Sequence, residues 1–218
     1  MDGSGGKAAD YFNRYMAAVD SAPVGDGTYP FHKNYWGGDL LTDNPSTFMS
    51  SFIPQFCWFQ TRYFGSSPYY QRLFAAWLKA DMKFWQLALP ASSEIWGKAV
   101  AGRIFGAGVG PAPSGYHVDR IDGSSDLVVS AAIMAGFLGA ADSPSLRQQI
   151  NDMLSWLYDN EVCAYTLALP DGRAPKVLWR CSVSHPEWRS PSADSVDFAT
   201  MALAVNAVPS GFYRKYAA

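Results

Sequence analysis

The residues best suited to chemistry lie in and after a glycine-rich stretch that runs from Ser93 to Asp126. This stretch carries the carboxylates Glu94, Asp119 and Asp122, and Asp197 follows near the start of a later helical segment. Two carboxyl groups brought close together in a pocket can act as a general acid and as a general base or nucleophile. These four carboxylates are therefore the candidate catalytic residues.

Each carboxylate also has a structural explanation that the sequence leaves open. Asp197 would stabilise the N-terminus of its helix by about 0.3–1 kcal/mol through the helix dipole. Asp122 precedes Gly123, and an Asp-Gly pair is typical of a tight turn. Glu94 could be a solvated charge at a helix end, or its pKa could be raised by desolvation beside Trp96.

The stretch from 93 to 126 is predicted to be an ordered loop that lines a pocket. Long loops in compact domains are usually functional or disordered, and disordered segments are poor in bulky apolar residues. This stretch contains Trp96, Ile104, Phe105, Tyr116 and Ile121, which favours order. A surface loop with incidental carboxylates is the alternative.

The candidate substrate-binding residues are mostly aromatic. Trp and Tyr offer a flat apolar face with a polar edge, which suits stacking on a sugar ring. His117 could orient a sugar hydroxyl, although a single histidine is more often a satisfied residue of a loop. The set comprises Trp36, Trp58, Gln60, Arg62, Trp96, Tyr116 and His117. Other tryptophans stand at helical spacing and are predicted core residues, namely Trp77, Trp85 and Trp156.

Composition argues against several classes of function. The chain has 218 residues, 49% of them hydrophobic, and a net charge of −2 with scattered Lys and Arg, so nucleic-acid binding is not expected. No apolar run approaches the ~18 residues of a membrane span. The three histidines are far apart in sequence, so we expect no metal site. Without a GxGxxG or P-loop motif, we expect no cofactor.

The cysteines and the N-terminus bear on the cellular location. The opening residues lack the apolar segment of a secretory signal, which makes a cytoplasmic location the default expectation. Those residues could also be the cut edge of a longer protein. The chain contains Cys57, Cys163 and Cys181 without a CxxC motif. A Cys163–Cys181 bridge across a hairpin is conceivable, but we expect free, buried thiols.

Apolar periodicity and turn signals divide the chain into buried helices and long loops. Helices are expected over 7–20, 46–64, 68–88, 125–140, 142–160 and 195–208, and a hairpin over 162–169 and 176–183. We predict that the loops 36–43, 94–126 and 184–197 converge on one concave face, because functional loops gather on a rigid scaffold.

Four segments, taken in order, resemble one known family. These are the aromatic-rich FIPQFCWFQTRYF (52–64), the loop carrying Trp96-Gly97, Gly115-Tyr116 and Asp122-Gly123, the apolar DLVVSAAIMAGFL after it, and the closing SVDFATMALAVN followed by GFYRKY. Together they resemble the glycoamylase-like domain of bacterial α/α-toroid proteins. That family includes relatives of cyclic β-1,2-glucan synthases and β-1,2-glucan hydrolases.

The resemblance implies a mainly α fold made of the helix pairs of an (α/α) toroid, to which the sequence adds one β-hairpin. A full toroid of this kind is longer than this chain. Residues 1–218 are therefore expected to form a single glycoamylase-like helical domain that is a shortened toroid or the C-terminal half of a larger one. A missing N-terminal helical half would then be a partner.

The function implied by the resemblance is that of a glycoside hydrolase-like, carbohydrate-active domain acting on a glucan-type oligo- or polysaccharide. Three carboxylate positions of the family pattern are occupied here by Gln60, Gly102 and Val205. The first alternative is therefore a non-catalytic carbohydrate-binding or structural module of polysaccharide metabolism. The second is a helical domain of polysaccharide biosynthesis.

Overall fold

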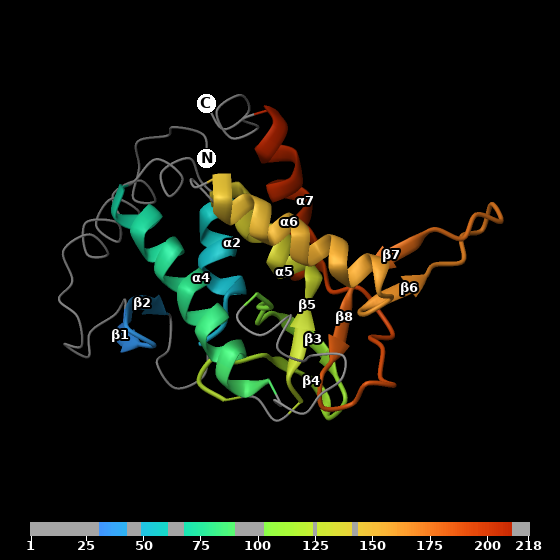
Figure 1. The fold of residues 1–218 in the computed structure, drawn as a ribbon, viewed down its shortest axis with the longest axis horizontal. Helices are drawn as coiled ribbons and strands as arrows, with labels where there is room; N and C mark the ends of the chain where they lie inside the picture. The colour runs from blue at the N-terminus through green and yellow to red at the C-terminus, as the bar shows by residue number, and fades with distance from the viewer. Residues whose placement is uncertain are drawn as a thin grey trace, which may run out of the picture.

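The fold is rich in helices and contains several small sheets (Figure 1). The computed structural model describes residues 31–42, 49–60, 68–89, 103–123, 126–140 and 144–210. Within these ranges the chain forms five α-helices, one short 3-10 helix and eight strands in four two-stranded antiparallel sheets. The expectation of a helix-rich fold is confirmed, whereas the expectation of a single hairpin is wrong.

The helices follow the predicted order closely where the structure describes them. Their bounds are α2 Phe52–Gln60, α4 Pro68–Ala88, α5 Ala131–Gly136, the 3-10 helix η1 Phe137–Ala140, α6 Pro144–Asp159 and α7 Ser195–Ser210. Pro144 opens α6, a position where proline loses no intrahelical hydrogen bond. The helix expected over 7–20 lies outside the described residues. None of the described helices is long and apolar enough to cross a membrane.

Strand pairs occur in places where loops or helix had been expected. The pairs are β1 Phe31–Tyr35 with β2 Gly38–Thr42, β3 Val109–Ala112 with β4 Gly115–Val118, β5 Val128–Ser130 with β8 Arg180–Ser182, and β6 Ala164–Thr166 with β7 Lys176–Leu178. The 162–183 hairpin is thus present as β6 and β7, but its last residues pair with β5. The helix expected from 125 begins only at Ala131, because the β-branched Val128 and Val129 find a partner strand in β8.

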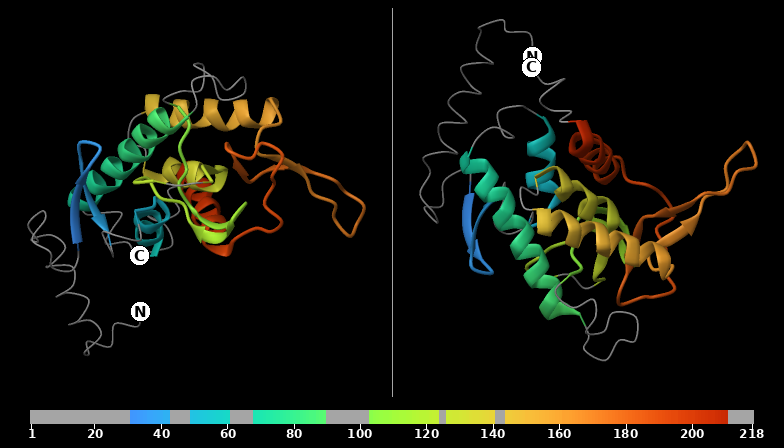
Figure 2. Two further views of the ribbon diagram at one scale, coloured as in Figure 1. Left: turned by 90° about the horizontal axis from the view of Figure 1, so that it is seen from below. Right: turned by 45° about the horizontal axis from the view of Figure 1, so that its top comes forward.

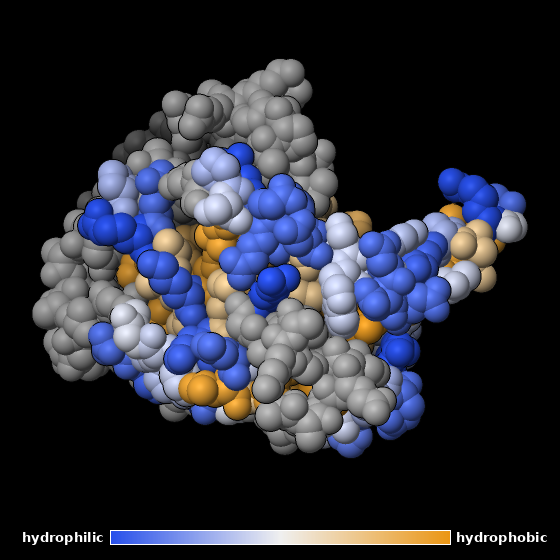
Figure 3. All heavy atoms as spheres, viewed as in Figure 1, coloured by the Kyte–Doolittle hydropathy of each residue, from blue (hydrophilic) through white to orange (hydrophobic). Residues whose placement is uncertain are grey.

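The core forms around α5 and η1, where η1 packs against α4 and α5 packs against α7. Trp77 and Trp85 of α4 are fully buried, as the helical spacing predicts, and Phe74 places its ring 4.9 Å from that of Phe137. α5 is buried along its whole length. α6 packs over it with Ile150, Met153 and Leu157, and its outer side is largely hydrophilic (Figure 3).

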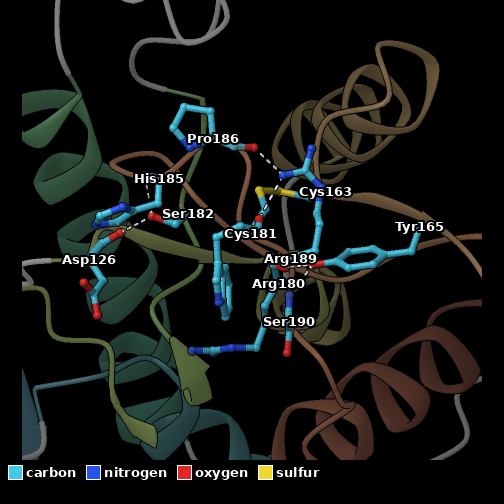
Figure 4. The surroundings of a disulfide bond; sticks show 11 residues. Asp126, Cys163, Tyr165, Arg180, Cys181, Ser182, His185, Pro186, Arg189 and Ser190 are labelled. Atoms are coloured by element: carbon cyan, nitrogen blue, oxygen red, sulfur yellow. Dashed lines mark hydrogen bonds between the residues drawn. A yellow bond between two sulfur atoms is a disulfide. The ribbon is translucent and has the colours of Figure 1, made fainter. Parts of the chain in front are cut away.

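The β6–β7 hairpin projects from the body as an arm, which all views agree on (Figure 2). At the base of this arm Cys163 and Cys181 form a disulfide, with their Cα atoms 4.9 Å apart (Figure 4). The expectation of free thiols is therefore wrong. An odd cysteine count carried no information on distance. The pairing of β6 with β7, extended by the hydrogen bond from the Trp179 amide to the Cys163 carbonyl, brings Cys163 close to Cys181.

We predict one free thiol per denatured, unreduced chain, because Cys57 alone remains outside the disulfide. The bridge spans 18 residues, and closing a loop of that length stabilises a fold by about 3 kcal/mol in the chain-entropy account. Replacing Cys163 and Cys181 together by serine should lower the free energy of unfolding in urea by about that amount. Cys57→Ser is the control for thiol number, and three free thiols in the wild type would contradict the pairing.

Candidate functional site

A buried arginine links three separate segments of the chain. The guanidinium of Arg180 in β8 lies 2.8 Å (Nη2) from Asp119 Oδ2 and 3.2 Å (Nη1) from Asp197 Oδ2. Its Nε donates a hydrogen bond to the Pro111 carbonyl at 3.1 Å. All three charged side chains are buried. We call these three residues the Arg180 cluster; it joins β8 to the residue after β4 and to the first turn of α7.

Charge, more than aligned hydrogen bonds, holds Arg180 to Asp119. Within the described residues neither Arg180 Nη2 nor Asp119 Oδ1 has a well-aligned hydrogen-bond partner, although Nη2 and Oδ2 are in ion-pair contact. Burial alone would lower the pKa of Arg180, but the two carboxylates outweigh it and raise that pKa above its usual value. The cluster therefore depends on all three charges being present together.

Asp197 is the most strongly anchored member of the cluster. Ser130 Oγ donates to its Oδ2 at 2.7 Å, and the Val109 amide donates to its Oδ1 at 3.2 Å. Burial raises the pKa of Asp197 to about 6, against the opposing effect of Arg180 and Ser130. A Cβ added to Gly108 would lie 2.3 Å from Asp197 Oδ2, so only glycine allows the backbone this close to the carboxylate.

The backbone of β8 is fixed from the arm side as well. The Tyr165 hydroxyl in β6 donates to the Arg180 carbonyl and accepts from the Ser190 amide at 2.9 Å (Figure 4). The next residue, Cys181, carries the disulfide. Arg180 therefore enters the cluster from a strand held on both sides.

The burial of Asp119 and Asp197 bears on their predicted roles. A catalytic carboxylate has to reach the sugar, whereas these two are at most 1% exposed and point at Arg180. In the described part of the chain they act as structural counter-ions. Their assignment as catalytic groups stays a prediction.

Asp122 lies in the tight turn that its neighbour Gly123 suggested. The Gly123 amide donates to the Arg120 carbonyl at 3.4 Å, which closes a four-residue turn. The Asp122 carboxylate accepts two hydrogen bonds from Arg120, at 2.7 and 2.6 Å, and lies 3.9 Å from Lys33 Nζ. The turn explanation is confirmed, and a catalytic role for Asp122 stays a prediction.

Tyr116 and His117, close in sequence to Asp119, are solvent-accessible residues of this region. Tyr116, in β4, is 66% exposed, and its hydroxyl donates to Asp194 Oδ2 at 2.6 Å. That hydrogen bond raises the pKa of Tyr116 to about 12. His117 is half-buried, with Nε2 at 3.5 Å from Asp119 Oδ1 and 3.8 Å from Asp126 Oδ2. The neighbouring Asp119 carboxylate raises the pKa of His117 above the ordinary value.

Trp36 is held in an unusual backbone conformation. It occupies the two-residue turn between β1 and β2 with φ at +53°, followed by Gly37 at +77°. Such turns require positive φ at both positions, and an aromatic residue there is strained. The indole is 38% exposed, and its Nε1 donates to the Ile121 carbonyl at 3.0 Å.

The described parts of the three predicted loops are in contact. Trp36 bonds to Ile121, and Tyr116 bonds to Asp194. The middle loop also meets α7 through Val109 and Asp197. The contact between the loops is confirmed, and a shared concave face stays a prediction.

The structure leaves several predicted site residues undescribed. Glu94, Trp96 and Arg62 lie outside the described residues, and so do the side chains of Trp58 and Gln60 in α2. The roles predicted for these five stay predictions.

Sequence reasoning missed three residues of this region, namely Arg180, Asp194 and Ser130. Arg180 carried a usable signal, because it is a charged residue inside the apolar run VLWRCSV. A charge in such a run is rarely buried unless it is paired. Asp194, directly before Ser195 at the start of α7, fits the preference of N-caps for aspartate.

A further buried carboxylate, outside the Arg180 cluster, fixes the backbone of the central loop at Gly106 and Ala107. Asp81 of α4 is fully buried and accepts hydrogen bonds from Ser51 Oγ at 2.5 Å and from the Gly106 and Ala107 amides at 3.1 and 3.0 Å. Burial raises the pKa of Asp81 from 3.8 to about 6. Asp81 therefore binds a backbone turn to α4 and does not face a ligand.

This raised pKa predicts a stability that falls as the pH rises. The folded state holds the Asp81 proton more tightly than the unfolded state, so its stabilisation is complete below about pH 4 and lost as the pH passes about 6. A difference of about two pKa units corresponds to about 3 kcal/mol. Between pH 4 and pH 7 the unfolding free energy of wild type should fall by about that much relative to Asp81→Asn. Urea unfolding at both pH values measures it, and parallel pH curves would contradict it.

The described residues contain no group of three or more His, Cys, Asp or Glu side chains arranged to hold a metal ion.

No protein-family model matches the sequence, and none of the curated proteins matches it. Its arrangement of helices and small sheets is nevertheless a known one, the glycoamylase-like fold.

The similar solved structures are candidate glucoamylases and an endo-β-1,2-glucanase. A candidate glucoamylase from Bacteroides caccae ATCC 43185 superposes with a TM-score of 0.62 at 15% identity, over 91% of this chain and 44% of that one. A candidate glucoamylase from Bacteroides uniformis ATCC 8492 gives 0.60 at 14%, over 84% and 41%. The endo-β-1,2-glucanase from Chitinophaga pinensis, in complex with sophorotriose and glucose, gives 0.59 at 13%, over 91% and 44%. This chain spans less than half the length of each, and at these identities the likeness shows the fold alone.

Proposed function

We propose that this chain is a carbohydrate-active domain that binds a glucan-type polysaccharide, as part of a glycoside hydrolase-like (α/α) toroid. The observation that carries the proposal is the exposed ring of Tyr116, held by Asp194 beside the half-buried His117. An aromatic face with polar groups at its edge is the arrangement that sugars stack on. The glucanase and the two candidate glucoamylases of the same fold support the choice of a glucan.

The Arg180 cluster supports binding at this surface by making it rigid. It ties β8, the end of β4 and the start of α7 together beneath Tyr116 and His117. A rigid site loses less freedom when it binds a ligand and therefore binds more tightly. Trp36, strained and half-exposed beside Ile121, is the second proposed contact with the sugar.

Hydrolysis is the second candidate function, favoured by the glucanase of the same fold. Asp119 and Asp197 form ion pairs with Arg180, and Asp122 forms an ion pair with Arg120. Of the four predicted carboxylates, Glu94 is the one that lies outside the described residues. We propose Glu94 as the acid if the chain hydrolyses its glucan.

We propose that this protein acts outside the cytosol. This proposal differs from the cytoplasmic location expected by default from the N-terminal sequence. Disulfides persist in oxidising compartments and are rare where thiols are kept reduced. The Cys163–Cys181 bridge supports such a compartment.

Tyr116→Ala should weaken glucan binding at least tenfold, because it removes the proposed stacking face; tenfold corresponds to about 1.4 kcal/mol. Calorimetry with sophorotriose, soluble β-1,2-glucan and other glucans measures the affinity. Tyr158→Ala is the matched control, because Tyr158 is an exposed tyrosine near the end of α6. Equal affinity in all three proteins would remove Tyr116 from the site.

The same proteins separate binding from hydrolysis. Release of reducing ends by wild type, and its loss in Glu94→Gln with affinity retained, would establish an enzyme. Binding without release would establish the non-catalytic module.

A further inference from the structure

We infer that Asp194 is a positioning residue for sugar binding, because its carboxylate fixes the exposed ring of Tyr116 in the orientation that a sugar meets. This inference rests on the proposed function and names a residue that sequence reasoning did not select. Asp194 would not itself touch the sugar; it would act through Tyr116.

The carboxylate of Asp194 is itself fixed by α7 before it meets the phenol. Its Oδ1 accepts a hydrogen bond from the Val196 amide at 2.9 Å, and its carbonyl accepts one from the Phe198 amide at 3.0 Å. Asp194 is therefore the N-cap of α7. Its second oxygen, Oδ2, accepts from the Tyr116 hydroxyl at 2.6 Å. One carboxylate thus joins a helix start to an aromatic ring 78 residues earlier in the chain.

The contact between Tyr116 and Asp194 is supported by close backbone packing on the β3–β4 side and on the α7 side. A Cβ added to Gly110 in β3 would lie 3.2 Å from Asp194 Cβ and 3.3 Å from Arg180 Nε. The sheet that carries Tyr116 is therefore packed closely against Asp194, beside Arg180. The α7 side is held in turn by Asp197, which lies in the first turn of α7 and pairs with Arg180.

Without this hydrogen bond the Tyr116 ring would be free to change rotamer. Tyr116 is among the most exposed large side chains of the described residues, so packing alone restrains it little. Binding a sugar would then require the ring to be ordered at that moment, and ordering one side chain weakens an affinity by about twofold to tenfold.

A purely structural role for Asp194 makes a different prediction. If Asp194 served only as the N-cap of α7, any good capping residue would replace it without effect on affinity. Serine is such a residue, and its side chain is too short to reach both the helix amide and the phenol. Asp194→Ser therefore keeps the cap and removes the bond to Tyr116, whereas Tyr116→Phe removes the same bond from the other side and keeps the aromatic face.

The test is a double-mutant cycle read by affinity for sophorotriose and soluble β-1,2-glucan. We expect Asp194→Ser and Tyr116→Phe each to weaken binding about fivefold, and the double variant to be no weaker than either. Urea unfolding should show the cap retained in Asp194→Ser. Alkaline difference titration should show one tyrosine fewer with a pKa near 12 in that variant.

The outcomes separate this inference from the function on which it rests. Unchanged affinity in Asp194→Ser, with binding lost in Tyr116→Ala, would overturn the positioning role and leave the binding site standing. Fivefold losses that multiply in the double variant would also overturn it, because the two residues would then act independently. A wild type that binds no glucan would overturn both the function and the positioning role. The titration would still report whether the Tyr116–Asp194 bond exists in solution.

Discussion

Replacing Arg180 with alanine should lower the free energy of unfolding by about 3–5 kcal/mol, the cost typical of removing one partner of a buried ion pair. Asp119 and Asp197 would remain buried without their counter-ion, and neither could be hydrated without opening the contact between β8 and α7. The effect should be the largest of any single charge removed from the described residues. Urea unfolding monitored by tryptophan fluorescence measures it.

The matched control is a removal of arginine at the surface. Arg173 pairs with Asp171 at 2.7 Å, but their side chains are 74% and 53% exposed. Exposed pairs contribute about 0–1 kcal/mol, so Arg173→Ala should change stability little. Equal losses in the two variants would contradict the view that the Arg180 cluster organises the fold.

Gly106→Ala should cost about 3–5 kcal/mol, the sum of backbone strain and crowding. Gly106 has φ at +126°, a conformation that alanine rarely adopts, and a new Cβ would lie 2.5 Å from the Ser130 carbonyl oxygen. That oxygen belongs to the backbone and cannot rotate away. The Gly106 carbonyl also accepts a hydrogen bond from the Ser130 amide, and the Gly106 amide donates one to Asp81. A shift of the Gly106 backbone would therefore disturb both hydrogen bonds.

Gly115 offers a control with nearly the same backbone. Its φ is +127°, yet no described atom lies within 4 Å of the position that a Cβ would take. Gly115→Ala should therefore show the strain alone, about 1–3 kcal/mol. The difference between the two variants isolates the crowding at Ser130, and the absence of a difference would contradict this explanation.

The helices could be predicted from sequence wherever burial follows a helical period. Phe74, Trp77 and Trp85 repeat on one face of α4, and all three are buried. β5 could not be predicted in this way, because only Ser130 separates Val128 and Val129 from the apolar residues of α5. What makes them a strand is the pairing of Val129 with Cys181, 52 positions later. Local propensity carries no information on such a partner.

In the candidate site, too, the sequence indicated which residues matter locally but not which distant residues they contact. Asp119 and Asp197 could be recognised as important from their setting, but the sequence could not tell an acid that faces a sugar from one that faces an arginine. Burial and pairing of charges are set by tertiary contacts, as is the distance between Cys163 and Cys181. Tyr116 could be recognised as an exposed aromatic of a glycine-rich loop, whereas its partner Asp194 lies beyond any local pattern.

The disulfide at the base of the arm also determines what a protease could do to this protein. The exposed Arg173, at the tip of the β6–β7 hairpin, lies between Cys163 and Cys181 in the chain and offers a trypsin-like enzyme an accessible bond. A cut after Arg173 would divide the polypeptide in two, yet the pieces would stay covalently joined through the bridge. The Arg180 cluster would keep its three members, and the nick would become visible only after reduction.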